Sequence, residues 1–156
     1  MILKKSIQRV ACLLCGGLFL GLTAASALVY KTPQELYQQS DLVVTGEVIE
    51  IDQDMDTTTI QFKIKEVLKG SPQTPHVTIK TAGGRVYLRK DQPQFLQIEK
   101  YLLFLKSKGA YYLCLNDADG QKIIRNDNIY PYAGNMTLSQ PLEDYLKSLP
   151  KPTKAA

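Results

Sequence analysis

The stretch DLVVTGEVIEI, residues Asp41 to Ile51, decides the fold that this sequence predicts. Its first half places one set of residues on the inner face of a strand: Leu42, Val44, Gly46 and Val48. Ile49 and Ile51 then take over the inward positions, and this change of phase predicts an extra residue, a β-bulge, near Val48–Ile49. A strand bent in this way can pair with one neighbour over its first half and with another over its second. We therefore expect it to close a small barrel.

The first 27 residues have the pattern of a secretory signal peptide. A basic start precedes the apolar run Val10 to Leu22, and Ala25-Ser26-Ala27 is typical of a cleavage site. The apolar run is shorter than the roughly 20 residues of a membrane span. We expect cleavage before Leu28 and export of the remainder to the cell envelope or the medium. An uncleaved anchor is the alternative.

Removal of this leader changes the charge of the chain. The whole sequence has 19 Lys and Arg against 15 Asp and Glu, and three of the bases (Lys4, Lys5 and Arg9) lie in the leader. The exported chain is therefore nearly neutral, which argues against general nucleic-acid binding. Cys114 is the one cysteine left and lies in an apolar run, so we expect it to be buried and to form no intramolecular disulfide.

The remaining chain is long enough for one domain, predicted over residues 28–149, with a disordered tail at 150–156. Thr32-Pro33-Gln34-Glu35 is a capping box, which predicts a helix to about Gln39. Strand patterns follow at 57–68, 76–81, 99–106, 111–115 and 123–124, with a loop at 85–97 that contains a short strand at 86–88. Helical spacing predicts a last helix from about Gln140 to Leu149, capped by Ser139, with Leu138 on its apolar face.

These elements predict a mainly β fold, a small closed antiparallel barrel of about five to six strands with a short N-terminal helix and a C-terminal amphipathic helix. The OB-fold type fits the coiled first strand best. A β-sandwich is the competing architecture, because the number of strands does not separate the two.

Four segments resemble a known group of proteins: SDLVVxGxV at Ser40–Val48, EVLKG at Glu66–Gly70, the pair Gly83-Gly84, and EKYLLFL at Glu99–Leu105. Together they resemble exported bacterial and archaeal domains of the netrin-like and tissue-inhibitor-of-metalloproteinases OB-fold group. The resemblance covers roughly residues 33–115. It implies a barrel, and it suggests inhibition of zinc proteases, which that fold performs with a mature amino-terminal cysteine. In this chain the corresponding first residue is Leu28.

No catalytic, metal or cofactor site is predicted. His76 is the only histidine, whereas zinc sites and Ser-His-Asp triads need further partners around it. The alternating acids Asp52, Asp54 and Asp56 lack the glycine of a calcium loop and predict a solvated turn. Asp117–Gly120 and Gly83-Gly84 are likewise predicted as turns.

The candidate binding residues are basic ones on the outer side of the second and third strands and on the segment after them: Lys63, Lys65, His76, Lys80, Arg85, Arg89 and Lys90. OB barrels bind oligonucleotides and oligosaccharides on this face. It would attract an anionic wall polymer, a phospholipid surface or an acidic protein segment, while Tyr87 is the one aromatic residue nearby in the sequence. The alternative is a solvated face with no ligand.

The sequence thus predicts an exported, non-enzymatic binding domain whose partner is an anionic envelope polymer or a protein. A protease inhibitor or protein-interaction module of the netrin-like type is the alternative. An exported hydrolase is a third class, for which a nucleophile–base pair is missing from the pattern.

Overall fold

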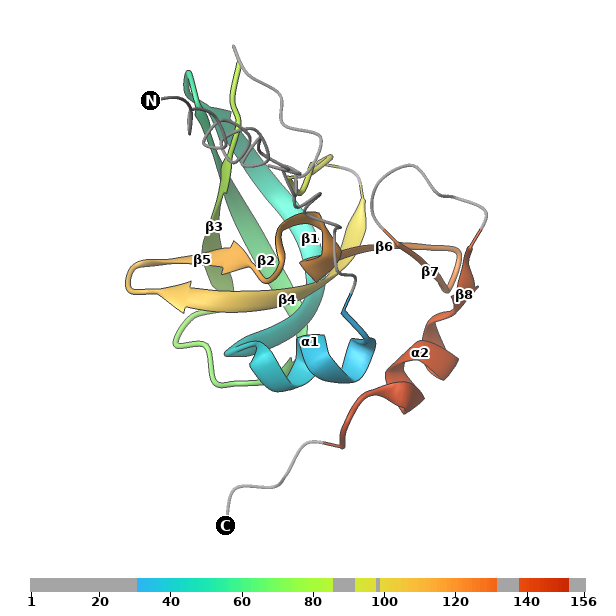
Figure 1. Ribbon diagram of the computed structural model, residues 1–156. Helices are drawn as coiled ribbons and strands as arrows, with labels where there is room; N and C mark the ends of the chain where they lie inside the picture. Colours follow the sequence, from blue (N-terminus) through green and yellow to red (C-terminus); the bar gives the residue numbers. More distant parts are fainter. Residues whose placement is uncertain (1–30, 86–91, 98, 132–137, 152–156) are drawn as a thin grey trace, which may run out of the picture.

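A computed structural model describes residues 31–85, 92–97, 99–131 and 138–151 (Figure 1). The predicted signal peptide, the short strand expected at 86–88 and most of the predicted tail lie outside the described residues. Within them the elements are α1 (Pro33–Gln39), β1 (Leu42–Gln53), β2 (Thr57–Lys69), β3 (His76–Ala82), β4 (Lys100–Lys108), β5 (Tyr111–Cys114), a 3₁₀ helix (Asp117–Gly120), β6 (Gln121–Arg125), β7 (Asn128–Pro131), β8 (Gln140–Pro141) and α2 (Leu142–Ser148).

Five of the described strands form a closed barrel in the order β1-β2-β3-β5-β4, and pairing of β1 with β4 completes the ring. The predicted barrel is confirmed, but the prediction that all its strands are antiparallel is wrong. β3 and β5 are parallel, with Ile79 opposite Tyr112. The reason is geometric: strands that alternate in direction around a ring of five leave one neighbouring pair that runs the same way.

β1 is shared between two neighbours, as its sequence predicts, but the predicted division of one neighbour to each half is wrong. Its first half, Leu42–Glu47, pairs with β4, while most of its length also pairs with β2. The register with β2 shifts between Val48 and Glu50, which confirms the bulge predicted there. The inward position predicted for Ile49 is wrong, because Ile49 is the extra residue of the bulge and is 48% exposed. Ile51 returns to the inner face and packs against the barrel core.

Two apolar layers lie on either side of β4, which explains why this strand is apolar on both faces. Tyr101, Leu103 and Leu105 belong to the core inside the barrel. Leu102 and Phe104 belong to a second core that includes residues of α1, β7 and α2. Cys114 is buried in the barrel core, as predicted.

Three further strands extend the sheet beyond the barrel. β6 pairs with β4, β7 with β6 and β8 with β7, so the described residues contain eight strands, of which five form the barrel, within the predicted five to six. Strands β6, β7 and β8 lie together with α2 on one side of the barrel in Figure 1.

The two helices differ in how well the sequence predicts them. α1 has the expected capping box between Thr32 and Glu35. The start of the last helix and its Ser139 cap are predicted wrongly: α2 begins at Leu142 after Pro141, with no side-chain cap. Residues 140–141 pair with β7 instead, and Leu138 is 67% exposed rather than part of the core.

None of the helices in the described part of the chain has the length and apolar character needed to cross a membrane.

Candidate functional site

The β2–β3 ladder brings four of the predicted basic residues onto one outer face. Lys63 lies opposite His76, and Lys80 lies opposite Thr59, four residues before Lys63. Lys65 continues the same face because side chains alternate along a strand. Lys63, Lys65 and His76 are exposed, and Lys80 is half-buried.

Barrel closure adds two residues that the sequence did not indicate. Glu47 of β1 lies opposite Lys63 of β2 on one side and opposite Lys100 of β4 on the other. The result is a row across four strands, which we call the cationic row: Lys100, Glu47, Lys63 and His76. Sequence reasoning missed Glu47 and Lys100 because they belong to strands whose pairing is not visible in a local pattern.

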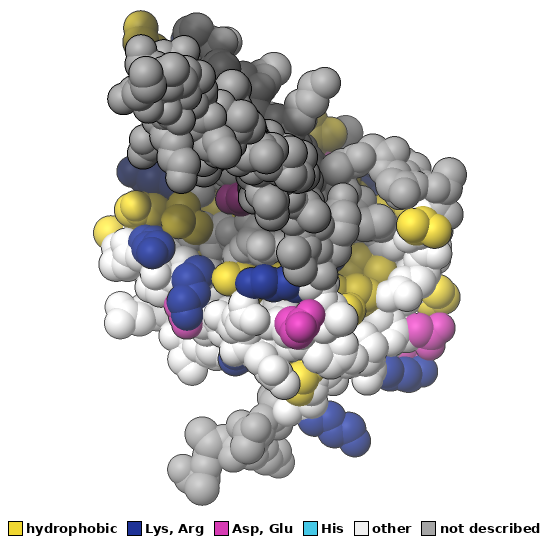
Figure 2. All heavy atoms as spheres, in the orientation of Figure 1, with side chains coloured by type: hydrophobic (Ala, Val, Ile, Leu, Met, Phe, Trp, Pro, Cys, Tyr) yellow, Lys and Arg dark blue, Asp and Glu magenta, His cyan; other side chains and the backbone are white. Residues whose placement is uncertain are grey.

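The single carboxylate of this row is surrounded by lysines. Lys65 Nζ lies 3.1 Å from Glu47 Oε2. This hydrogen bond, assisted by the charges of Lys65, Lys63 and Lys100, holds the pKa of Glu47 below its usual value. The three lysines outnumber Glu47 at this row, while Glu50 and Asp52 of β1 lie further along the same outer face, opposite Gln61 and Thr59. The excess is local, since acidic and basic side chains are interspersed on the face of the molecule shown in Figure 2.

An aromatic residue also lies beside this face. Lys80 Nζ is 5.0 Å from the centre of the Tyr111 ring, a cation–π contact between β3 and β5. Sequence reasoning missed Tyr111 because β5 joins β3 only through the closure of the barrel. The aromatic residue that it named, Tyr87, lies outside the described residues.

The remaining predicted basic residues follow β3. Arg85 is exposed beyond the end of the strand, and its backbone N–H donates to Asp54 O in the β1–β2 turn at 2.9 Å. Arg89 and Lys90 lie outside the described residues.

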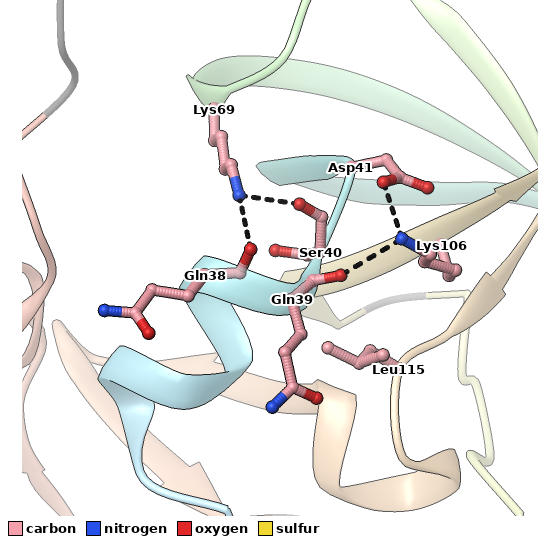
Figure 3. Close-up of a pocket in the computed structure, with 7 residues that line it drawn as sticks. All are labelled: Gln38, Gln39, Ser40, Asp41, Lys69, Lys106 and Leu115. Carbon is pink, nitrogen blue, oxygen red and sulfur yellow. Dashed lines mark hydrogen bonds and ion pairs between the residues drawn. The ribbon is translucent and has the colours of Figure 1, made fainter.

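A groove at the α1–β1 junction contains two further lysines, but the chain itself uses them (Figure 3). Lys69 Nζ donates to the carbonyl oxygens of Tyr37, Gln38 and Ser40 at 2.6, 3.1 and 2.7 Å. These three bonds use every N–H of the ammonium group and satisfy carbonyls at the end of α1. Lys106 Nζ lies 2.8 Å from Asp41 Oδ1. We interpret this groove as a joint between helix and barrel rather than as a ligand site.

The residues that carry the family resemblance also have roles in holding the fold together. Lys69 of the EVLKG segment holds α1. Gly70 has φ +89°, and a Cβ at this position would lie 2.6 Å from Asp41 O. A Cβ on Gly46 would lie 2.1 Å from Lys63 O, and one on Gly84 would lie 2.1 Å from Asp54 O. These motifs are therefore explained by the barrel and by themselves identify no ligand.

Asp54 and Asp119, two carboxylates away from this face, have partners within the chain. Asp54 Oδ1 accepts a hydrogen bond from the Met55 amide in the β1–β2 turn. Asp119 accepts from Lys122 Nζ at 3.0 Å and from the Lys31 amide at 2.9 Å. Burial would raise the pKa of Asp119, but these bonds and the Lys122 charge outweigh it and lower the pKa. Among the described residues, no three His, Cys, Asp or Glu side chains lie together in a group that could hold a metal ion.

Comparison with known proteins finds no matching family model and no matching curated protein.

Proposed function

We propose that this chain is an exported, non-enzymatic binding domain that holds an anionic partner on the outer face of β2 and β3, at the cell envelope or outside the cell. The cationic row carries the proposal. Its lysines come from β2 and β4, and they exceed the one carboxylate between them. The lysines of the α1–β1 groove, in contrast, are engaged by a backbone carbonyl and by a carboxylate of the same chain.

The architecture favours the same face. The strand order β1-β2-β3-β5-β4, closed by β1 and β4, fits an OB-like barrel, which supports the netrin-like resemblance as a proposal. OB barrels bind extended polymers across strands two and three. The leader-like pattern of residues 1–27 supports export.

The shape of the surface favours a polymer over a small molecule. Neighbouring strands lie about 4.8 Å apart, so the cationic row spans roughly 14 Å from Lys100 to His76. The row lies across a sheet face, whereas small-molecule sites are concave and enclose most of the ligand. An envelope polymer with repeated negative charges would contact several of these cations together.

The test compares two charge-reversed variants of equal net charge. One carries Lys63→Glu and Lys100→Glu in the cationic row. The control carries Lys147→Glu and Lys151→Glu, both exposed, the first on α2 and the second just after it, outside the strands of the cationic row. Each protein is applied at about 50 mM salt to immobilised anionic envelope polymer and eluted with a salt gradient, because attraction between exposed charges weakens as salt is added.

We expect the wild type and the control to be retained and the cationic-row variant to elute without retention or at much lower salt. Equal elution of the two variants would show that retention reflects net charge alone and would contradict the proposed face. Failure of the wild type to bind would contradict the function itself.

A further inference from the structure

A second row of side chains lies beside the cationic row on the same outer face. Gln61 of β2 lies opposite Thr78 of β3, and Thr78 Oγ1 donates to Gln61 Oε1 at 3.2 Å. Tyr111 of β5 is the next neighbour, since it lies one residue before the parallel pair of Ile79 and Tyr112. Lys108 of β4 lies opposite Tyr111. We call Gln61, Thr78, Tyr111 and Lys108 the polar–aromatic row; Glu50 of β1 lies opposite Gln61, at the β1 end of this row.

The two rows form one continuous surface. Gln61 lies two residues before Lys63 on β2, about 7 Å along the strand. Thr78 lies between His76 and Lys80 on β3, with its side chain on the same face as theirs. A ligand that crosses the β2–β3 ladder would therefore contact cations on one side and amide, hydroxyl and aromatic groups on the other.

The chemistry of the second row differs from that of a site for simple polyanions. Phosphate groups are satisfied by cations and N–H donors. Gln61 and Thr78 supply both donors and acceptors, which match the hydroxyl groups of a sugar. The Tyr111 ring is half-buried and supplies a flat apolar surface against which the C–H face of a sugar ring can pack.

We propose that the anionic partner is an acidic polysaccharide, a chain of sugars that carry carboxylate groups. In this arrangement one sugar packs on Tyr111 and bonds to Gln61 and Thr78. The Lys80 ammonium, which lies over the Tyr111 ring in the free protein, turns to a sugar carboxylate. Neighbouring carboxylates along the polymer lie at Lys63 and His76. This inference rests on the proposed function and names its ligand class.

The experiment measures binding of three probes by titration calorimetry: polygalacturonate as a carboxylated polysaccharide, polyphosphate as an anionic polymer without sugar rings, and a neutral galactan. The variants are Tyr111→Leu, which removes the aromatic surface, Tyr111→Phe, which keeps it, and Thr78→Val, which removes one hydroxyl with little change in shape. Circular dichroism and urea unfolding show whether each variant is folded.

We expect Tyr111→Leu to weaken polygalacturonate binding about tenfold, the loss of roughly one aromatic contact. Its binding of polyphosphate stays within about twofold of the wild type. Tyr111→Phe keeps its affinity for polygalacturonate, and Thr78→Val weakens it. If Tyr111→Leu does not fold, Thr78→Val decides, since it must weaken polygalacturonate and leave polyphosphate unchanged.

Equal effects of these variants on both anionic polymers, or no effect on either, would overturn the polysaccharide inference while leaving anionic binding intact. Binding of the neutral galactan as tightly as polygalacturonate would also overturn it. If the wild type binds neither anionic polymer, both the proposed function and the polysaccharide inference are contradicted.

Discussion

Gly46 lies where β1 is paired with β2 on one side and with β4 on the other. A Cβ at this position would lie 2.1 Å from Lys63 O and 2.7 Å from the Phe62 ring. The Lys63 oxygen belongs to the backbone, which cannot move away from an added Cβ without breaking the β1–β2 ladder. The absence of a side chain is thus a condition for the close approach of these strands.

We predict that Gly46→Ala lowers the free energy of unfolding by about 3 kcal/mol, the upper part of the usual range for overpacking. Urea denaturation measures the change. Gly109→Ala is the matched control: Gly109 has φ +72° but nothing within 4 Å of an added Cβ, so its cost is about 1 kcal/mol from backbone strain alone. Equal losses in the two variants would contradict the close packing at Gly46.

Single residues also show where sequence reasoning succeeds and fails. The change of phase at Val48–Ile49 predicts the bulge, because alternation of side chains is a local property of the chain. It does not tell which residue is the extra one, so the inward position that it predicts for Ile49 is wrong. Tyr111 and Lys80 meet only through the pairing of β3 with β5, for which neither strand carries a local signal.

The attachment of α1 to the barrel depends on Lys69 at the end of β2. The Lys69 ammonium satisfies three carbonyl oxygens at the end of the helix and lies 5.2 Å from the Tyr37 ring. The Tyr37 hydroxyl donates to Leu68 O on the same strand. A seven-residue helix is too short to be stable alone, so these contacts and the packing of Leu36 hold it.

We predict that Lys69→Met destabilises the protein by about 1–3 kcal/mol, because its charged, part-buried hydrogen bonds to the carbonyls of Tyr37 and Ser40 are lost. The α1 amides should also exchange faster with solvent than in the wild type. Lys63→Met is the control. Lys63 is exposed on the outer face of β2, so its replacement should change the free energy of unfolding by less than about 0.5 kcal/mol. A loss no larger than that of the control would show that Lys69 does not fasten the helix.

Helix boundaries illustrate the same division between local and long-range information. The start of α1 was predictable because its capping box is contained in four consecutive residues. The start of α2 was not, because residues 140–141 are held as a strand by Asn128 and Ile129 of β7. The helical spacing begins at Leu138, but pairing with β7 keeps residues 140–141 in a strand, so the helix starts only at Leu142.

For the whole molecule, closure of the barrel creates both the fold and the candidate site. The sequence predicts a closed barrel and the basic side of β2 and β3. An odd number of strands in the ring requires one parallel pair, but no local pattern indicates that β3 and β5 form it. Glu47, Lys100 and Tyr111 join the candidate site only when the ring is closed.

Glu47 provides the most direct test of this account, because it is paired with Lys63 of β2 and with Lys100 of β4. Cross-strand backbone NOEs in the isotope-labelled protein report each pairing, since opposed residues in antiparallel strands lie about 4.5–5.5 Å apart between Cα atoms. We predict NOEs from Glu47 to both lysines. NOEs to Lys63 without any to Lys100 would mean that β1 does not close the barrel and that the cationic row does not exist.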